Sequence, residues 1–586
     1  MQIKQCQGCK YLWMLPEYDT KSILELAASY NLSLSVIQAI IMRGMTKKDE
    51  IDSYLFCSLQ DVADPSLLKD AEKAVARIIY AIENHEKILI FGDYDVDGIT
   101  STSLMVNCLL SVGAHVNFFL PHRLYDGYGL SVKTVKRAVA SGYNLIITVD
   151  NGITAFDAAE EARKNNIDLI ITDHHKPHEM LPSAYAIINP HRADCPYPYK
   201  NLAGVGVAFK LISLLFSTLK QELPSKVYEL LLLGTIADVV PLTGENRFWV
   251  RYGLQHINRN QSYAFTVLKR NGKVVKPSLS SIDIGYSLAP QINALGRMKD
   301  PRQGVAFLIG TDKHDIETIG TVLHELNEAR KDVERSIVSE LDSAVREKKI
   351  DIDKENIILA GSKSWSPGVI GLVASRLVSN YGRPALLFHL NENGMAKGSC
   401  RSIPEFNIFE ALQKCSHLIE KFGGHSCAAG LSIKQENLAA LKDELEKLIA
   451  QQLTSFDLQQ KKTIDAEVHL SDLNTKFITD MALLEPFGAE NPQPIFYIKN
   501  VCLVKPPVIL KDVHIKCMIF ADGVIKPIIF FNRPDLIELL FKIGNDPFDV
   551  IAYVSQNYWN GKMNIELTGV DIGIKTTESL NESNHN

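Results

Sequence analysis

No stretch of this sequence is apolar for long enough to cross a membrane as a helix. Such a helix needs roughly 18–20 consecutive apolar residues, whereas charged residues, 22% of the chain, interrupt its 46% of hydrophobic residues throughout. The N-terminal segment MQIKQCQGCKYLWML also lacks the apolar core and the small-residue cleavage site of a secretory signal. We therefore expect a cytoplasmic protein, and its 586 residues predict about three or four globular domains.

Cysteine is present without a paired framework. The ten cysteines are scattered from Cys6 to Cys517, which is typical of a protein in a reducing compartment. Cys6 and Cys9 form a single CxxC motif, and no second CxxC or HxxxH motif lies near it. Because a structural zinc ion needs four such ligands, we do not expect one here.

A strong positive charge is also missing. The formal net charge is −6 and the pI is near 6.3, which argues against a protein held on nucleic acid by its overall charge. Local basic surfaces remain compatible with these values, because a cluster of metal-binding carboxylates would raise the acidic count.

Short apolar runs alternate with helical segments over residues 87–189. Runs rich in Ile, Leu and Val, such as KILIF and LIITV, are separated by segments with helical periodicity, such as SVKTVKRAVASG. This alternation predicts a parallel β-sheet with helices on both faces. Two further apolar helices are expected at 204–219 and 226–240. We assign residues 61–310 to one catalytic α/β domain and residues 1–60 to an N-terminal extension.

A long charged helix is predicted next. Residues 311–348 contain no proline and one glycine, and their apolar residues recur at helical spacing, as at Ile316, Ile319 and Leu323. We interpret the segment as a connecting helix, and two ordinary helices of one bundle are the alternative. A smaller α/β domain is expected at 349–455, an all-β domain with an OB-like barrel in preference to a sandwich at 456–575, and a disordered polar tail at 576–586.

Acidic residues and histidines gather where predicted strands end. Asp93, Asp95 and Asp97 follow an apolar run in IFGDYDVDG, and the motifs TVDNG and TDHH follow two further runs. Asp238 lies in the apolar helix GTIADVV, where a lone charge is costly unless it has a partner. Because ligands bind outside the carboxyl ends of parallel strands, we expect one cleft to collect the strand-end residues. These are Asp93, Asp95, Asp97, Asp150, Asp173, His174 and His175.

So many carboxylates in one pocket cannot stay ionised without cations. Oxygen and nitrogen ligands without thiolates suit Mn²⁺, Mg²⁺ or Fe²⁺ better than a structural zinc, and a shared carboxylate could bridge two ions roughly 3.5–4 Å apart. The DxDxDG pattern also resembles the start of a calcium-binding EF-hand loop. That loop follows a helix and has Glu at position 12, whereas here a strand precedes it and Leu104 stands at that position.

Together these motifs resemble the DHH phosphoesterase superfamily, which carries DHH after a strand, with motifs like DYDVDG upstream and TIADVVPL downstream. Further motifs are similar to those of the bacterial single-strand-specific 5′→3′ DNA exonucleases within this superfamily. They occur in the same order and extend along nearly the whole chain. They are PHRLYDGYGLS (121–131), QINALGRMKDP (291–301), SPGVIGLVASRL (366–377), GSCRS (398–402), GGHSCAAG (423–430) and EPFGAENPQPIF (485–496).

The resemblance implies two metal sites. Asp95 and Asp150 would hold the first ion, with Asp93 as an additional ligand. Many relatives carry a metal-binding His four residues before the position of Asp95, where this chain has Phe91. The second ion would be held by Asp97, Asp150, His174 and Asp238, so that Asp150 bridges the two.

Catalytic and strand-binding roles follow from the same resemblance. His175 would contact the scissile phosphate, and Asp173 would orient a histidine. In the GSCRS loop, a terminal phosphate could be held by Ser399, Arg401 and Ser402, since a guanidinium binds phosphate bidentately.

Four more positions complete this picture. Arg123 could reach the same phosphate, or it could be an ordinary surface residue. His425 could contact the nucleic acid backbone, where its neighbouring glycines permit a close approach, or it could be a hydrogen-bonded structural residue. Arg297 is a further candidate for strand binding. Relatives usually have Gly where this chain has Ala489, a change that we expect to alter only a turn.

The leading hypothesis is an exonuclease that degrades single-stranded DNA 5′→3′ to mononucleotides with two Mn²⁺ or Mg²⁺ ions, in DNA repair and recombination. A cleft between the two α/β domains would admit one strand, and the barrel would supply a basic groove with aromatic side chains. We expect a monomer that needs no membrane, with a helicase and a single-strand-binding protein as partners. One or two of the following aromatics would stack on bases: Phe496, Tyr497, Phe530, Phe531, Tyr553, Tyr558 and Trp559.

Two other functions remain open. A DHH phosphodiesterase for short oligonucleotides, cyclic dinucleotides or pyrophosphate would use the same metal chemistry, but it would not require the extra β domain. A non-catalytic DNA-binding scaffold would not require the intact acidic set. The preference for DNA over RNA and the direction of digestion rest on the resemblance, and ligand type does not separate Mn²⁺ from Mg²⁺.

Overall fold

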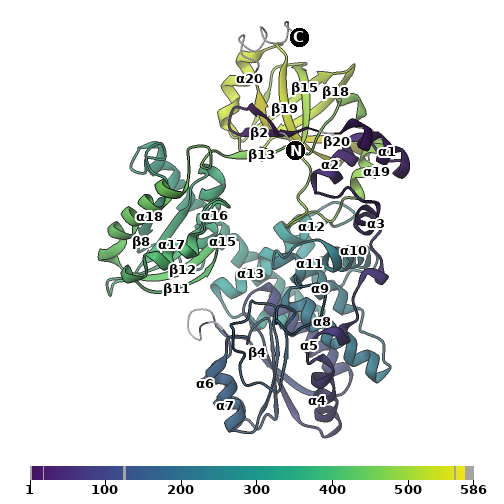
Figure 1. The fold of residues 1–586 in the computed structure, drawn as a ribbon, viewed down its shortest axis with the longest axis vertical. Helices are drawn as coiled ribbons and strands as arrows, with labels where there is room; N and C mark the ends of the chain where they lie inside the picture. Colours follow the sequence, from purple (N-terminus) through teal and green to yellow (C-terminus); the bar gives the residue numbers. More distant parts are fainter. Residues whose placement is uncertain (1–2, 18, 123–126, 128, 560–561, 575–586) are drawn as a thin grey trace. The chain divides into compact units, whose positions relative to one another are not determined.

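The computed structural model describes residues 3–17, 19–122, 127, 129–559 and 562–574 (Figure 1). The chain divides into two compact units. The first comprises Arg43–Asn327 with Met481–Gln493, and the second comprises Met1–Met42, Glu328–Asp480 and Pro494–Asn586. Among the described residues, no single helix has the length and apolarity to cross a membrane. The bent pair α1 (Thr20–Tyr30) and α2 (Leu34–Met42) meets that test only jointly, by length and composition.

A parallel sheet forms the centre of the first unit (Figure 1). Its strands lie in the order β4-β3-β5-β6-β7, and each neighbouring pair is parallel, which confirms the predicted sheet. The strand order reverses between β3 and β5, the position where open α/β sheets bind ligands. The bounds are β3 Lys87–Phe91, β4 His115–Phe119, β5 Leu145–Val149, β6 Asp168–Thr172 and β7 Ala186–Ile188.

Successive residues of β3 point to opposite faces of this sheet. Ile88 and Ile90 belong to the core that contains α4, α5, α8 and α9, whereas Leu89 and Phe91 belong to the core with α6 and α7. Because both faces are covered, the strand is apolar at each of these positions. The helices are α4 Ala71–Glu83, α5 Val96–Ser111, α6 Val132–Ala140, α7 Phe156–Lys164, α8 Gly204–Leu219, α9 Lys226–Ala237 and α10 Gly244–Arg259.

The turn after β3 leads directly into α5. Asp95 is the N-cap residue of α5, and its carboxylate accepts a hydrogen bond from Gly98 N at 3.0 Å. Gly98 packs against the backbone of Asp93, whose carbonyl oxygen would lie 2.5 Å from a Cβ at position 98. A larger residue is therefore excluded there, and the tight turn keeps Asp93, Asp95 and Asp97 at the edge of the sheet.

One uninterrupted helix confirms the predicted connecting helix. α15 runs from Lys313 to Arg346, a length of 34 residues. Its first half buries Ile316 and Leu323 in the core of the first unit, and its second half buries Ile337 and Leu341 in a separate core. The helices that precede it are α11 Tyr263–Asn271, α12 Ser281–Asp283, the π-helix η3 Ile284–Leu288, α13 Ala289–Met298 and α14 Arg302–Ile309.

The smaller α/β domain has a mixed sheet of order β11-β12-β10-β9-β8. β8 and β9 are parallel, and the other neighbouring pairs are antiparallel. Ala428 of β12 pairs with Arg401 of β10 on one side and with His425 of β11 on the other. The last residues of β10 and β11 therefore lie at the same end of the sheet. The bounds are β8 Ile358–Ser362, α16 Ile370–Tyr381, β9 Ala385–Leu390, β10 Met395–Arg401, α17 Ile408–Lys414, β11 Ile419–His425, β12 Ala428–Lys434 and α18 Leu438–Gln452.

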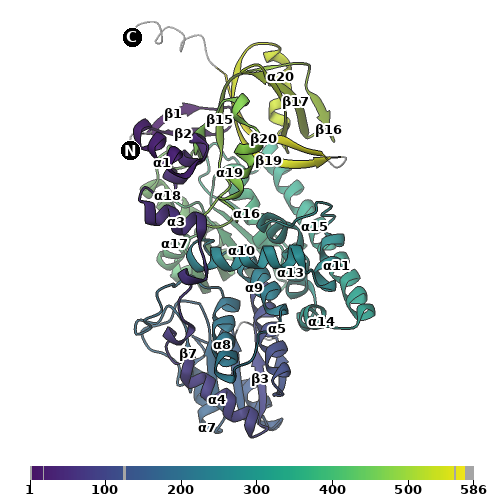
Figure 2. The same cartoon turned by 90° about the vertical axis from the view of Figure 1, so that its right-hand side faces the viewer.

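The C-terminal domain is a closed barrel, as predicted (Figure 2). Its strands follow the order β15-β19-β20-β18-β17, and pairing of β17 with β15 closes the barrel. Inward residues such as Ile515, Cys517 and Ile519 alternate with outward ones along β17. The bounds are β14 Ala466–Glu467, α19 Thr475–Ala482, β15 Phe496–Leu503, β16 Val508–Leu510, β17 His514–Ala521, β18 Val524–Phe530, α20 Ile537–Ile543, β19 Phe548–Trp559 and β20 Lys562–Gly573.

The N-terminal residues belong partly to each unit. β1 (Ile3–Gln7) and β2 (Leu12–Pro16) form a hairpin, and β2 pairs in parallel with β13 (Lys461–Thr463). Trp13 is buried, and its indole N–H donates to Asp571 of β20 at 3.1 Å. The hairpin is therefore anchored to the barrel, whereas α3 (Lys48–Phe56) lies in the first unit.

Candidate metal centre

The acidic motifs that follow β3, β5 and β6 meet around one imidazole. His174, which follows β6, has its Nε2 at 3.1 Å from Oδ1 of Asp150, which follows β5. Asp238, the C-cap residue of α9, brings Oδ2 to 3.5 Å from the same nitrogen. Asp97, in the first turn of α5, reaches it at 3.9 Å through Oδ2. Four segments that are distant in sequence thus supply one cluster.

Three groups of described side chains have ligand atoms close enough to bind a metal ion. Within each group these atoms lie within 4.8 Å of one another. Asp150 and His174 each belong to two groups, so the groups overlap as the ligand sets of two neighbouring ions would. The groups are Asp93, Asp95 and Asp150; Asp97, His174 and Asp238; and Asp150, His174 and His175.

The central atoms of the cluster have no hydrogen-bond partner. Asp150 Oδ1, His174 Nε2 and Asp238 Oδ2 are all buried and unpaired. Buried polar atoms are nearly always paired, so three converging unpaired atoms are arranged for a ligand that accepts electron pairs from all of them. A divalent cation is such a ligand, and carboxylates mixed with imidazole suit Mn²⁺ or Mg²⁺.

Burial disfavours the charged forms of these side chains. Burial and the charge of Asp95 raise the pKa of Asp97 to about 7. Burial, with neighbouring carboxylates, also raises the pKa values of Asp150 and Asp238 well above their ordinary value. Burial lowers the pKa of His174 to about 3. The neutral imidazole is the form that binds metals, and a bound cation would favour the ionised carboxylates.

The N-terminus of α8 holds Asp97. Gly204 N and Val205 N donate to its Oδ2 and Oδ1 at 2.6 and 2.8 Å, and these donors favour the ionised carboxylate. A Cβ at Gly204 would lie 2.6 Å from Asp150 Cβ, so glycine lets two ligands approach one helix end. Sequence reasoning overlooked this contribution, although the motif AGVG at the start of an apolar helix carried the signal.

Two residues of the cluster region have left-handed backbone conformations. Asp150 has φ +60° and Val239, next to Asp238, has φ +61°. Aspartate tolerates this conformation, but for a β-branched residue it costs on the order of 1–3 kcal/mol. The surrounding structure must therefore hold the loop after Asp238 in place.

Asp173 accepts hydrogen bonds from its own loop and from the loop that follows β5. It accepts hydrogen bonds from Ile153 N at 2.9 Å, His174 N at 2.8 Å and His175 Nδ1 at 2.7 Å. Burial tends to raise the pKa of Asp173, but the bond and charge of His175, the bond from Ile153 N and the charge of His174 together hold the pKa below its ordinary value. Burial tends to lower the pKa of His175, but the bond and charge of Asp173, together with the charges of Asp97 and Asp93, raise it. The pair therefore fixes the orientation of the His175 ring.

Phe91 occupies the position at which the sequence resemblance implies a histidine in many relatives. It is buried at the end of β3 and stacks on Phe119, with ring centroids 5.8 Å apart. The group formed by Asp93, Asp95 and Asp150 therefore contains only carboxylates. Asp93 Oδ1 also accepts from Tyr94 N at 2.8 Å, which orients its carboxylate.

The residues expected to bind a terminal phosphate are distributed over both units. Arg297 lies on α13 in the first unit, whereas Ser399 and Arg401 lie on β10 in the second. Arg401 Nη1 donates to Ser399 Oγ at 3.3 Å and to Cys400 O at 2.8 Å, which fixes the guanidinium beside the hydroxyl. Arg123, which was also predicted to reach this phosphate, lies outside the residues that the structure describes.

Two further candidates differ in accessibility. The Ser402 hydroxyl is buried and donates to Phe406 O at 2.7 Å, which ties it to its own loop. His425 is exposed at the end of β11. His425 therefore has the more accessible side chain of the two.

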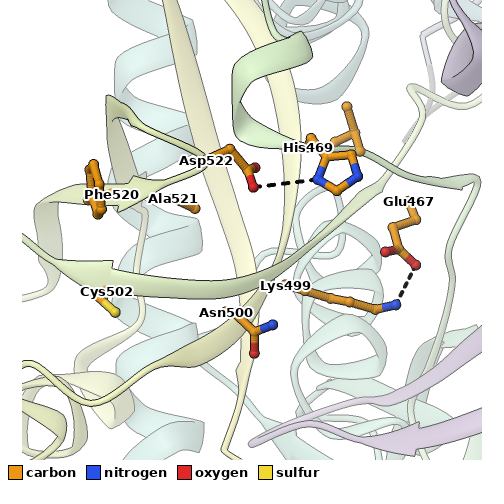
Figure 3. Close-up of a pocket in the computed structure, with 9 residues that line it drawn as sticks. Glu467, His469, Lys499, Asn500, Cys502, Phe520, Ala521 and Asp522 are labelled. Atoms are coloured by element: carbon orange, nitrogen blue, oxygen red, sulfur yellow. Dashed lines mark ion pairs between the residues drawn. The ribbon is translucent and has the colours of Figure 1, made fainter.

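The barrel presents a small pocket and two exposed aromatic side chains. Phe531 is 53% exposed and Phe520, which was not among the predicted aromatics, is 45% exposed. Phe520 lines a pocket of about 300 Å³ together with the ion pairs His469–Asp522 (3.5 Å) and Lys499–Glu467 (2.7 Å) (Figure 3). Its outward position follows the two-residue alternation of β17.

The other predicted aromatics of the barrel are less accessible. Phe496, Tyr497 and Phe530 are buried in the core, and Tyr553 is half-buried. The side chains of Tyr558 and Trp559 are outside the described part of the structure.

Three protein families match successive parts of the chain. The DHH family, N-terminal domain, matches residues 87–235. The DHHA1 domain matches residues 354–451, and the RecJ OB domain matches residues 464–571. The fold and the cluster therefore define a DHH-type protein with a DHHA1 domain and a C-terminal OB domain.

Individual relatives narrow this assignment. The chain is 33% identical over 568 residues to the single-stranded-DNA-specific exonuclease RecJ of Bacillus subtilis (strain 168), covering 96% of this chain and 71% of that protein. It is 32% identical over 478 residues to RecJ of Escherichia coli (strain K12), and the match covers 78% of this chain and 81% of that protein. Its fold is similar to the crystal structure of RecJ in complex with Mn²⁺ from Thermus thermophilus, with a TM-score of 0.81 and 26% sequence identity. That match covers 96% of this chain and 80% of the other. The chain belongs to the RecJ family.

Proposed function

We propose that this chain is a metal-dependent exonuclease that degrades single-stranded DNA 5′→3′ to mononucleotides. One observation carries the proposal: Asp150 Oδ1, His174 Nε2 and Asp238 Oδ2 converge, buried and unpaired, in a chain of the RecJ family. The names of the relatives support single-stranded DNA as the substrate. The OB barrel supports a long strand over a dinucleotide, because a small substrate would not need it.

Two overlapping ligand sets would hold two divalent ions, Mn²⁺ or Mg²⁺. When bound, the ions would lower the pKa of the attacking water and offset the charge that develops on the phosphate. The absence of thiolates and the overlap of the groups at Asp150 support this arrangement. The first set would be Asp93, Asp95 and Asp150, which form one group. The second would be Asp97, His174 and Asp238, which form another group, with Asp150, which shares a third group with His174.

His175 would contact the phosphate under attack. Its side chain is 37% exposed, compared with 13% for His174. The bond from Nδ1 to Asp173 fixes the orientation of the ring. A donor at this position would hold a phosphate oxygen and orient the phosphorus for in-line displacement.

The GSCRS segment, which forms the end of β10, would recognise the 5′ end of the strand. Arg401, fixed beside Ser399, offers a planar pair of donors to a terminal phosphate. Arg123 remains a predicted ligand of a terminal phosphate. His425 and Arg297 would contact phosphates of the strand, whereas the Ser402 hydroxyl, which donates to Phe406 O, would stabilise the end of the segment. An anchored 5′ end would set the direction of digestion.

The barrel would bind the single strand. Phe520 and Phe531 are exposed aromatic side chains on which bases could stack, and Lys516 is an exposed cation on β17. Stacking on aromatic rings is tolerant of sequence because every base has a π-face. The enzyme would therefore digest strands of any sequence.

The cellular setting follows from the chemistry. All ten cysteines are free thiols, which fits the reducing cytoplasm. There the enzyme would act as a monomer in DNA repair and recombination. A helicase would supply the unwound strand, and a single-strand-binding protein would present it.

End-labelled substrates test the proposal. With Mn²⁺ or Mg²⁺, a 5′-phosphorylated single strand should be digested from its 5′ end to mononucleotides, whereas a blunt duplex should persist. Turnover of dinucleotides alone would contradict the strand specificity and support a short-substrate phosphodiesterase. Full activity in a chelator would contradict the metal chemistry, and strand binding without hydrolysis in Mn²⁺ would indicate a scaffold.

A further inference from the structure

A segment late in the sequence belongs to the unit that contains the metal centre. Met481–Gln493 lies within the part of the chain that matches the RecJ OB domain, yet it packs with Arg43–Asn327 as one compact unit. The segment includes most of the motif EPFGAENPQPIF, to which the chemistry of the cluster assigns no role. We call residues 483–491 the strap.

Buried polar side chains hold the strap in place. Asn491 is fully buried, donates from Nδ2 to Leu484 O at 2.9 Å and Pro486 O at 2.7 Å, and accepts from the Tyr54 hydroxyl at 2.8 Å. Arg247, which is 1% exposed, donates to Leu484 O at 3.0 Å. Because any shift of the strap would leave buried donors unpaired, these bonds keep it in one conformation.

The middle of the strap contacts the loop that follows Asp238. Ala489 O accepts a hydrogen bond from Leu242 N at 2.9 Å. Gly488 lies against the Leu242 side chain, since a Cβ at position 488 would be 2.6 Å from Cδ1 and 3.0 Å from Cγ. Leu242 is buried and follows Asp238 by four positions. The strap therefore fixes both the backbone and the side chain of this loop.

Asp238 relies on its loop for its position. The Asp97 carboxylate is held by two backbone N–H groups, whereas Asp238 Oδ2 has no hydrogen-bond partner. The left-handed conformation of Val239 persists only where neighbouring contacts enforce it. The Tyr199 hydroxyl donates to Thr243 O at 2.9 Å at the far end of the loop, and the strap holds the residue before it.

We propose that the strap is a positioning element for the metal ligand Asp238. Its contacts with Leu242 set the path of the loop after α9, and this path sets the distance between Asp238 and His174. Gly488 and Asn491 would act as positioning residues, because Gly488 packs against Leu242 and Asn491 bonds to the strap itself and to Tyr54. This role presupposes the proposed function, in which Asp238 is a ligand.

Mn²⁺ binding to the full chain, measured by calorimetry without DNA, tests this role. Gly488→Ala adds a methyl group that forces Leu242 away. We expect one class of Mn²⁺ sites to weaken about 10- to 100-fold, the usual effect of losing a group that orients a ligand. Leu242→Ala removes the contact with Gly488 by shortening the side chain, and it should also weaken Mn²⁺ binding at that class of sites. The double variant should bind Mn²⁺ more tightly than either single variant, because the new methyl group occupies the vacated volume.

Ser281→Ala is the matched control. Ser281 Oγ donates to Phe487 O at 2.7 Å, so the variant loosens the strap where it does not touch the loop after Asp238. We expect a lower Tm with unchanged Mn²⁺ affinity. Wild-type affinity in both Gly488→Ala and Leu242→Ala would overturn the positioning role, as would an equal loss in Ser281→Ala. If Gly488→Ala does not fold, Leu242→Ala decides alone. Failure of the wild-type chain to bind Mn²⁺ would instead contradict the metal centre itself.

Discussion

His174 Nε2 and Asp150 Oδ1 lie 3.1 Å apart, and neither atom has a hydrogen-bond partner. The two residues follow adjacent strands, so the backbone of the sheet fixes their separation. Without a cation, this pair lies among buried carboxylates whose charges repel. Metal binding should therefore stabilise the fold as well as enable hydrolysis.

Asp150→Asn should separate stability from activity. In metal-free protein the substitution removes a buried charge that burial and neighbouring carboxylates disfavour, so we expect a Tm at least as high as that of wild type. At a hundred-fold excess of Mn²⁺ over Kd, wild type should gain about 2.7 kcal/mol of stability, and the variant should gain less. Hydrolysis should fall by about 10³-fold or more. Thermal unfolding with and without Mn²⁺ measures the first effect.

Asp168→Asn is the control for this substitution. Asp168 starts β6, and its partly exposed carboxylate pairs with the buried guanidinium of Arg77. The variant should lose about 1.5–3 kcal/mol in either condition, the contribution of a hydrogen bond to a charged group, and keep the full response to Mn²⁺. A wild-type Mn²⁺ response in Asp150→Asn would show that Asp150 is not a shared ligand.

His174→Ala should abolish hydrolysis and leave strand binding largely intact. The imidazole belongs to two of the three candidate ligand groups, so its loss should weaken Mn²⁺ binding and lower kcat by about 10³-fold or more. Strand affinity, measured by fluorescence anisotropy in chelator, should change little. His178→Ala, an exposed residue of the same loop beside Phe156, should retain activity. Equal losses in both variants would contradict the assigned role of His174.

Gly204→Ala should damage the metal centre without removing any ligand. The new Cβ would lie 2.7 Å from Asp150 Oδ1, so either Asp150 or the start of α8 must move. We expect Mn²⁺ affinity to fall about 10- to 100-fold. Gly206→Ala, two positions further along α8, meets its nearest atom at 3.3 Å and should bind Mn²⁺ normally. Calorimetric titration compares the two, and equal affinities would disprove the steric argument.

Arg401→Gln should reduce the preference for a 5′-phosphate. A hydrogen bond to a charged group contributes about 1.5–3 kcal/mol, so kcat/KM on phosphorylated strands should fall roughly 10- to 150-fold. Strands with a 5′-hydroxyl should be affected much less. Arg376→Gln, on the exposed side of α16 near Glu334, should change neither rate. If Arg401→Gln lowered kcat/KM equally on both kinds of strand, Arg401 would not recognise the terminal phosphate.

The ion pair of Glu317 predicts a change of stability in acid. Glu317 accepts from Arg270 Nη1 at 3.0 Å and from the Tyr263 hydroxyl at 2.6 Å. The bond from Arg270, together with that from Tyr263, lowers the pKa of Glu317 from 4.5 to about 2. A lowered folded-state pKa stabilises the protein above the ordinary value, and the contribution is lost as pH falls toward the folded value.

We therefore expect wild type to have a higher Tm than Glu317→Gln at pH 7. The difference should shrink below pH 4.5 and vanish near pH 2. Glu325→Gln, at an exposed position of the same helix, should show no such dependence. A difference that grows in acid would contradict the assigned pKa.

Local patterns of the sequence predicted most of the elements around the cluster. The strands β3, β5, β6 and β7 are short apolar runs because both faces of the sheet are buried there. Helix α15 is continuous because nothing in residues 313–346 interrupts its helical spacing. The placement of Asp93, Asp150 and His174 at one edge followed from the same strands, since parallel strands end together.

Long-range contacts were beyond those patterns. No periodicity indicates that Gly204 presents its amide to Asp97, or that Ala489 accepts a bond from Leu242. Phe91 shows the same point: the substitution is visible in the sequence, but only the structure places its ring on Phe119. Such contacts join segments that are far apart in the chain, so local propensity carries no information about them.

The sequence by itself determined the domain order, the parallel sheet, the barrel and the set of acidic residues that lie at strand ends. It could do so because burial imposes a period on each strand and helix, and because chain direction fixes which ends meet. The tertiary structure decided which oxygen and nitrogen atoms converge, which backbone amides hold Asp97 and which segment supports Asp238. These arrangements depend on differences of a few tenths of an ångström in the distances between residues that are far apart in the sequence. The close packing of the whole unit sets those distances.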